Sequence, residues 1–310
     1  MDSKENKNII KRGYASVQKV GNQIAITNKL LTNTNDKLAR EYFEKGKNCY
    51  ENEYIDSAYK NYTKAIQLKP DYAEAYYYRG LVKHYIGHQE YSEQYIRDYD
   101  GALEDYNKAI ELKSDYAEAY CNRGNVKRVL EYEDKCPGAI EDYNKAIELK
   151  PDYADAYDDR GNVKHYVLKD YHGAIIDYTK AIELKNINAY WSRGDVKYLL
   201  KDYDGAIQDY TKAIDLNPKN TSALYYYRGN VKNDLKDYKG AIEDYSKAIE
   251  LYPNKAEAYF NRGLVKKEMG DLKGACQDWM KTKELSRYNL DKIFHENLEE
   301  MIQKYCINMK

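Results

Sequence analysis

The sequence predicts an all-α protein built as a helical solenoid, and three observations support this prediction. An Arg-Gly pair with Val-Lys one residue further on recurs six times, and each copy is followed by a Gly-Ala pair at an expected helix start. Steps of 34, 44, 37, 33, 35 and 34 residues separate the key glycines, which are Gly46, Gly80, Gly124, Gly161, Gly194, Gly229 and Gly263. A period of about 34 with two helices per unit is typical of a helical solenoid, in which each unit packs against its neighbours.

The composition argues against several classes of protein. The chain has 310 residues, 33% of them charged, and a net charge of −1, so opposite charges are interleaved along it. This balance disfavours a protein held to nucleic acid by a general positive field. No apolar run approaches the roughly 18 residues of a membrane span. The first residues also lack the apolar stretch of a secretory signal.

The cysteines favour a reducing compartment. Cys49, Cys121, Cys136, Cys276 and Cys306 are scattered, odd in number and without a CxxC pair. We therefore expect five reduced thiols and a cytoplasmic protein.

Residues 1–36 carry no repeat. Their apolar residues recur at helical spacing and predict an amphipathic helix from about Ile9 to Leu31. Residues 32–36, Thr-Asn-Thr-Asn-Asp, read as a linker that ends in an N-cap. We expect this N-terminal helix to cover the exposed face of the first repeat, with a dimerisation or partner-docking helix as the alternative.

Residues 37–289 are predicted to form the repeat array, and residues 290–310 a capping helix at its far end. The second repeat holds about ten extra residues, and Tyr91, Tyr95 and Tyr99 within it have the spacing of an extended helix. The seven repeats are expected at about 39–72, 73–116, 117–153, 154–186, 187–220, 222–255 and 256–289.

The repeated skeleton resembles the tetratricopeptide repeat over roughly residues 37–287. Seven copies share an aromatic residue, Gly, Ala, a second aromatic residue and Ala, as in Tyr190, Gly194, Ala206, Tyr210 and Ala213, and four copies end in Pro. The resemblance implies a right-handed superhelix of about seven antiparallel helix pairs with terminal capping helices. It also implies that the first helices line a concave groove in which partners bind.

One departure from the family's common pattern predicts an ion-pair ladder. Where the family usually has Leu before the Gly and Tyr three residues after it, these units have Arg and Lys. The second helix carries Asp just before its aromatic residue, and the first unit has neither change, with Lys45 and Asn61 instead. We expect bidentate pairs within the last six units, namely Arg79 with Asp105, Arg123 with Asp142, Arg160 with Asp177, Arg193 with Asp209, Arg228 with Asp244, and Arg262 with Asp278.

The groove positions predict a mildly acidic surface for a peptide. Asn side chains there can donate to and accept from an extended backbone, and aromatic rings can hold side chains. We expect a neutral to basic peptide, extended or helical, along repeats three to six. The candidate residues are Tyr77, Asn125, Arg128, Asp158, Asn162, Trp191, Asp195, Tyr226 and Asn230.

No catalytic arrangement, metal site or cofactor site is expected. The adjacent carboxylates Asp158 and Asp159 fall on different helix faces, and the glycines follow the repeat rather than a phosphate-binding loop. His84 and His88 lie four apart with Glu90 nearby, which would suit a metal, but Gly87 lies between them and no cysteine is close.

The sequence thus predicts a non-enzymatic protein–protein interaction scaffold with a protein or peptide partner. We expect no membrane partner, and a monomer or weak self-association. Two alternatives stay open. An RNA-binding helical repeat protein is disfavoured by the lack of a basic stripe. A regulatory or docking subunit of an enzyme complex would use the N-terminal helix or the insert near residues 86–99.

Overall fold

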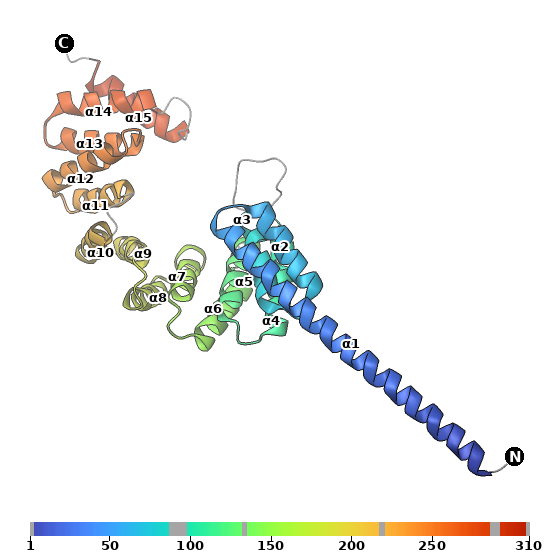
Figure 1. Cartoon of the computed structure of the whole chain (residues 1–310). Helices are drawn as coiled ribbons and strands as arrows, with labels where there is room; N and C mark the ends of the chain where they lie inside the picture. Colours follow the sequence, from blue (N-terminus) through green and yellow to red (C-terminus); the bar gives the residue numbers. More distant parts are fainter. Residues whose placement is uncertain (1–2, 87–97, 132–134, 217–220, 286–291, 308–310) are drawn as a thin grey trace. The chain divides into compact units, whose positions relative to one another are not determined.

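The computed structural model describes residues 3–86, 98–131, 135–216, 221–285 and 292–307. Within these ranges the chain forms fifteen α-helices and one short π-helical segment, and no strand (Figure 1). The prediction of an all-α helical repeat fold is therefore confirmed.

The helices fall into two compact units, Met1–Lys150 and Pro151–Lys310, which we describe separately. The first unit contains α1 (Ser3–Glu51), α2 (Ile55–Leu68), α3 (Ala73–Ile86), α4 (Tyr99–Leu112), α5 (Ala117–Leu130) and α6 (Pro137–Leu149). The second contains α7 (Ala154–Asn162), η1 (Val163–Val167), α8 (Tyr171–Glu183), α9 (Asn188–Leu199), α10 (Tyr203–Leu216), α11 (Ser222–Asp234), α12 (Tyr238–Leu251), α13 (Ala256–Glu268), α14 (Leu272–Leu285) and α15 (Lys292–Tyr305).

Consecutive helices pack as pairs, and each pair corresponds to one sequence repeat. The C-terminal part of α1 packs with α2, and later pairs such as α3–α4 and α11–α12 follow the same rule. Within each unit, the second helix of a pair also packs against the first helix of the next, as α10 does with α11. The core is consequently distributed along the chain rather than gathered at one centre.

A fully buried ring fills the crossing point of each pair. Six pairs have a tyrosine there and the last pair has Trp279. The ring fits because the facing helix carries glycine: a Cβ placed on Gly229 would lie 2.8 Å from Cε1 of Tyr245. The six tyrosines are Tyr62, Tyr106, Tyr143, Tyr178, Tyr210 and Tyr245.

Replacing Gly229 with alanine should therefore destabilise the chain. At an open helical site the same change stabilises by about 1 kcal/mol because alanine favours the helix. Here the added methyl group overpacks the Tyr245 ring, and we expect a loss of about 1–3 kcal/mol in thermal unfolding. In a Tyr245→Leu background the ring is absent, so the substitution should become neutral or favourable. A gain of stability in the native background would contradict the packing argument.

The recurring Gly-Ala pair reflects helix capping. The carboxylate of Asp237 precedes α12 and accepts a hydrogen bond from the backbone N–H of Gly240 at 3.0 Å. A Cβ at Gly240 would collide with that carboxylate, so glycine lets the cap close tightly. Equivalent bonds join Asp98 to Gly101, Asp170 to Gly173, Asp202 to Gly205 and Asp271 to Gly274.

The prediction of a linker at residues 32–36 is wrong. These residues continue α1, which runs without a break from Ser3 to Glu51. The hydroxyl groups of Thr32 and Thr34 donate to backbone carbonyls four residues earlier, at 3.0 and 2.9 Å. Both hydroxyls are therefore hydrogen-bonded within the helix, and neither residue ends it. The expected covering of the first repeat is also wrong for the described side chains before Asn35, because every one of them is exposed.

The C-terminal helix α15 packs on α14 as a capping helix. Leu298 and Ile302 are buried against Trp279. Cys276 of α14 and Cys306, just beyond α15, form a disulfide, so the prediction of five reduced thiols is wrong. The spacing of 30 residues gave no sign of this pairing, because it depends on how α15 folds back.

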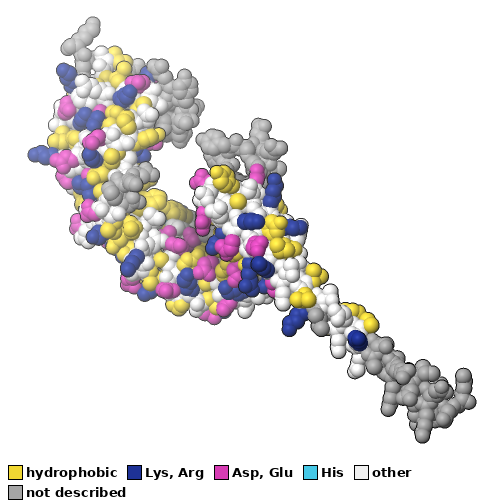
Figure 2. Space-filling view, in the orientation of Figure 1, with side chains coloured by type: hydrophobic (Ala, Val, Ile, Leu, Met, Phe, Trp, Pro, Cys, Tyr) yellow, Lys and Arg dark blue, Asp and Glu magenta, His cyan; other side chains and the backbone are white. Residues whose placement is uncertain are grey.

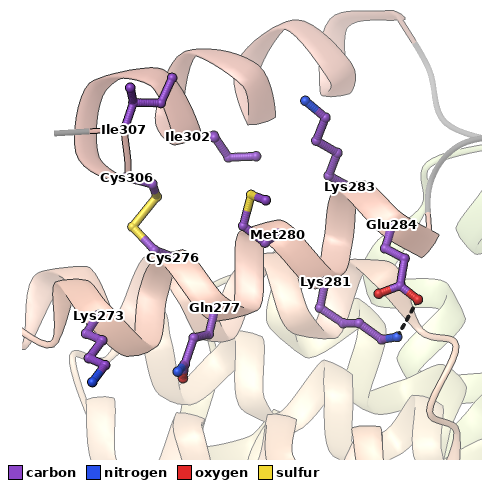
Figure 3. Close-up of a pocket in the computed structure, with 10 residues that line it drawn as sticks. All are labelled: Lys273, Cys276, Gln277, Met280, Lys281, Lys283, Glu284, Ile302, Cys306 and Ile307. Atoms are coloured by element: carbon purple, nitrogen blue, oxygen red, sulfur yellow. Dashed lines mark hydrogen bonds and ion pairs between the residues drawn. A yellow bond between two sulfur atoms is a disulfide. The ribbon is translucent and has the colours of Figure 1, made fainter. Parts of the chain in front are cut away.

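An open groove of about 960 Å³ lies between α14 and α15, beside the disulfide (Figure 3). Its apolar lining includes Met280 and Ile307, which are 54% and 64% exposed. Lys281 and Glu284 at its rim form an ion pair at 2.9 Å.

Two further predictions concern other parts of the chain. No helix in the described residues is both long and apolar enough to cross a membrane. The proposed helical extension at Tyr91 and Tyr95, like most of the docking insert near residues 86–99, lies outside the described residues.

Candidate functional site

The Arg–Asp pairs are present in all six units where the sequence predicts them. In each, the guanidinium Nε lies 2.8–2.9 Å from Oδ2 of the aspartate. The Nη2 atom lies 2.6–2.7 Å from Oδ1, which completes a bidentate pair. The aspartate side chains are only 2–5% exposed. The first unit differs as expected, since Asn61 donates to Ser57 O of its own helix.

The sequence did not reveal two further partners of each pair. A lysine one turn after the arginine, such as Lys232, reaches the same carboxylate at 2.8–3.0 Å. In five of the pairs the remaining guanidinium nitrogen reaches back to the preceding repeat, as Arg228 Nη1 does to the Thr211 hydroxyl at 2.9 Å. The arginine also stacks on a tyrosine three residues earlier, with Arg228 5.3 Å from the Tyr225 ring centre. The ladder therefore ties neighbouring repeats together as well as the two helices of one repeat.

Three of the predicted groove residues lie in the first unit. Tyr77 is 9% exposed and packs among Tyr78, Tyr106 and Tyr116, so the expectation that it forms an open binding pocket is wrong. Its ring is part of the core because the next repeat covers it. Asn125 accepts a hydrogen bond from the Tyr143 hydroxyl at 2.8 Å, whereas Arg128 keeps a buried Nε atom with no hydrogen-bond partner.

The predicted asparagines serve the scaffold. The amide oxygen of Asn162 accepts from Tyr178 at 2.9 Å, and that of Asn230 accepts from Tyr245 at 2.8 Å. Each bond satisfies the hydroxyl of a buried core tyrosine, which would otherwise be costly. Tyr106 shows the alternative, since its hydroxyl has no hydrogen-bond partner. The amide oxygen of each of these asparagines already accepts a hydrogen bond from a tyrosine, which limits the use of the side chain in binding a peptide backbone.

Two of the remaining predicted residues of the second unit form a surface that is both acidic and aromatic. Asp195 and Trp191 lie four residues apart on α9, on one helix face. The Asp195 side chain is 26% exposed, and Trp191 is 39% exposed and stacks on Tyr227. Tyr166 of η1 is 41% exposed, and burial together with the nearby charge of Asp195 raises its pKa. Burial raises the pKa of Asp195 above its ordinary value.

Tyr226 lies one repeat further along, on α11. Its hydroxyl accepts a hydrogen bond from Asn261 at 3.2 Å, and the Lys255 ammonium lies 4.7 Å from its ring centre. The ring is half-buried and already has a cation against it.

Two ionisable groups, one partly buried and one buried, lie in the α7–α8 repeat, which precedes the repeat of Asp195. Burial, together with the neighbouring charge of Asp159, raises the pKa of Asp158 to about 7. Its Oδ1 atom is buried without a hydrogen-bond partner, and Oδ2 accepts a weak bond from Asn162 at 3.4 Å. Burial, and then Lys169, lowers the pKa of His165 to about 4, so this imidazole is neutral at pH 7. Its Nε2 atom lies 3.8 Å from Asp195, too far for a hydrogen bond.

The sequence places His165 among the groove positions but does not predict its burial. The helix widens into the π-helical segment Val163–Val167, which buries His165 and stacks it on Tyr166 at 3.9 Å. Such segments are frequent at functional sites but have no clear sequence signal.

Among the described side chains, no three His, Cys, Asp or Glu residues gather as a metal site would require. His88 and Glu90, two members of the suggested metal site, lie outside the described residues.

Comparison with known proteins identifies the repeats. A model described as "TPR repeat" matches residues 98–127, 133–166 and 229–270, and one described as "Tetratricopeptide repeat" matches residues 187–220. No curated protein matches the chain.

Solved structures show the same fold. A tetratricopeptide repeat protein from Parabacteroides merdae is 20% identical with a TM-score of 0.56, over 86% of this chain and 99% of that one. YrrB, described as a TPR protein with an unusual peptide-binding site, is 24% identical with a TM-score of 0.53, over 64% and 99%. PilF of Pseudomonas aeruginosa is 18% identical with a TM-score of 0.60, over 76% and 98%.

The repeat matches and the helix-pair fold together define the class of protein. The chain contains tetratricopeptide repeats at the matched residues, and its helix pairs have the fold of tetratricopeptide repeat proteins. This fold generally forms non-catalytic scaffolds for protein–protein interaction, so a protein or peptide partner is implied.

Proposed function

We propose that this chain is a non-catalytic scaffold whose second unit binds a partner segment with a basic side chain. The segment would be extended or helical and would lie along the first helices α7, α9 and α11. The observation that carries the proposal is the partly exposed carboxylate of Asp195, with the exposed rings of Trp191 and Tyr166 around it.

The chemistry of this surface favours a cation. The rings offer faces that attract an ammonium or guanidinium group, and the carboxylate beside them supplies an opposite charge. Asp158 of the preceding repeat adds further negative charge once it ionises, and His165 adds no positive charge at neutral pH because its pKa is lowered to about 4. A lysine or arginine side chain of a partner fits this arrangement.

The similarity to YrrB, a TPR protein with an unusual peptide-binding site, supports a peptide as the ligand class. At 24% identity the similarity extends to the fold and not to the binding residues. The sequence of the ligand therefore has to be found experimentally.

Selection from a displayed library of random peptides would test the proposal. We expect the purified chain to enrich peptides that contain lysine or arginine. Asp195→Asn should weaken binding of a selected peptide by about 10- to 100-fold, the range for loss of a charged hydrogen-bond partner. Asp215→Asn, a matched change at an exposed site on α10, should leave the affinity unchanged. Equal loss in both variants, or enrichment of peptides without basic residues, would refute the proposal.

The same peptide should bind more tightly as pH rises. Because the pKa of Asp158 is raised to about 7, its carboxyl group is mostly neutral at pH 6 and mostly ionised at pH 8. The added negative charge should strengthen binding of a cationic peptide severalfold across that interval, measured by calorimetry. In Asp158→Asn this part of the pH dependence should disappear.

A further inference from the structure

The N-terminal part of α1 stands apart from the repeats. The helix extends well beyond α2 and α3, which pack only on its C-terminal part (Figure 1). Every described side chain from Gln18 to Thr34 is exposed. Four of them are large and apolar, with exposed fractions of 55–63%, and these are Val20, Ile24, Leu30 and Leu31.

This segment is poorly suited to exist as a lone helix in water. Between residues 18 and 34 it contains one glycine and many Thr, Asn and β-branched residues, all weak helix formers. Its only charged residues are Lys19 and Lys29, so no ion pair along the helix supports it. Apolar and uncharged side chains dominate its described surface (Figure 2). Most helices of this kind gain their stability by packing an apolar face against a partner.

The apolar residues follow a heptad pattern. Ile24, Leu31 and Leu38 are seven residues apart and occupy one core row, conventionally named d. The second core row, named a, contains Gly21, Asn28 and Asn35. In a coiled coil, an asparagine in the a row specifies the register and the number of strands, at a cost in stability.

We propose that this segment pairs with the same segment of a second copy of the chain, as a parallel, in-register coiled coil over residues 18–38. The asparagines select this partner. In a parallel, in-register pair, Asn28 faces Asn28 and Asn35 faces Asn35, so each amide can donate to and accept from its counterpart. An unrelated apolar helix would leave these amides without a partner inside the seam.

The residues beside the seam also permit two identical chains to approach. The described flanking positions hold Gln18, Val20, Ala25 and threonines, none of them charged. The hydroxyls of Thr27, Thr32 and Thr34 donate to carbonyls of their own helix at 2.9–3.0 Å and need no other partner. Lys19, Lys29 and Asp36 fall on the outer positions of the heptad, where like charges of two copies stay apart. The polar a row weakens the core, so the dimer dissociates on dilution.

Light scattering coupled to size-exclusion chromatography tests the proposal on the full chain. At high concentration we expect twice the chain mass of 36.4 kDa, falling towards the monomer mass on dilution. The double variant Ile24→Asp with Leu31→Asp places charges in the seam and should halve the mass. Leu30→Asp, an equally exposed leucine on the outer side of the heptad, should leave the dimer intact. Thermal unfolding of each variant establishes that the repeats still fold.

Cross-linking distinguishes the orientation of the two helices. A cysteine at Leu31 lies opposite its own copy only in a parallel, in-register pair, so Leu31→Cys should give a covalent dimer on oxidation. Leu30→Cys and the native chain should give little, because outer positions are too far apart for a disulfide. A native chain that stays monomeric at all concentrations, or a dimer that survives the double Asp substitution, would overturn the proposal. A dimer without the Leu31→Cys cross-link would overturn the parallel register.

Discussion

Replacing Asp244 with alanine is expected to destabilise the α11–α12 repeat by about 3–5 kcal/mol, the cost of removing one partner from a buried ion pair. The Asp244 side chain is 4% exposed and neutralises two cations, Arg228 at 2.7 Å and Lys232 at 2.8 Å. Without the carboxylate both cations keep their charge in a largely buried site. Hydrogen exchange of the α11 and α12 amides measures the loss where it occurs, which suits a repeat protein whose unfolding need not be all-or-none.

A control variant on the same helix separates burial from the mere loss of a charge. Glu250 also pairs with a lysine, Lys247, at 2.8 Å, but its side chain is 67% exposed. Glu250→Ala should leave hydrogen exchange nearly unchanged, because exposed pairs contribute little. If both substitutions had the same small effect, the ladder would not stabilise the fold.

The contacts of the ladder explain why it recurs in adjacent repeats. Arg262 binds Asp278 of its own repeat and donates through Nη1 to Ser246 of the preceding one, at 2.9 Å. Loss of one aspartate therefore loosens the arginine that joins two repeats. In a solenoid, where stability is the sum of repeat and interface terms, this loss should extend to the preceding helix pair.

The fold and the ladder could be predicted because both repeat. A requirement such as glycine opposite the Tyr245 ring appears seven times in the sequence, so it can be separated from chance. The Arg–Asp pairs could be predicted for a related reason. The first repeat has Lys45 at the position of the arginine and Asn61 at the position of the aspartate, so both partners change together. The lysine that shares the carboxylate was overlooked because lysine is common on exposed helix faces.

Features that occur once were harder to predict. Thr32 and Thr34 suggested a linker, since their types favour helix ends, yet their hydroxyls are satisfied within the helix. Tyr77 has the sequence position of a groove residue, but the ring of Tyr116 from the turn into the next repeat lies 4.8 Å away and helps bury it. Whether a side chain at such a position stays open depends on the bulk of its neighbour in the following repeat. Trp191 is exposed and Asp195 is partly exposed, at the surface positions that the sequence suggests, and their use in binding stays a prediction.

Reduction of the Cys276–Cys306 disulfide should selectively destabilise the C-terminal helix. The disulfide closes a loop of about 30 residues, and the chain-entropy relation assigns such a loop about 3–4 kcal/mol. The apolar contacts of Leu298 and Ile302 with Trp279 remain after reduction, so α15 should open more often without unfolding the array. We expect faster hydrogen exchange in α15 and little change in α11 or α12.

A thiol count and a serine variant complete this test. Denatured but unreduced protein should show three reactive thiols, from Cys49, Cys121 and Cys136, and five after reduction. Cys306→Ser should exchange as fast in α15 as the reduced native chain, and reductant should have no further effect on it. Five reactive thiols before reduction would contradict the pairing. Unchanged exchange after reduction would instead mean that the apolar contacts alone hold α15 on α14, with the disulfide contributing nothing to the cap.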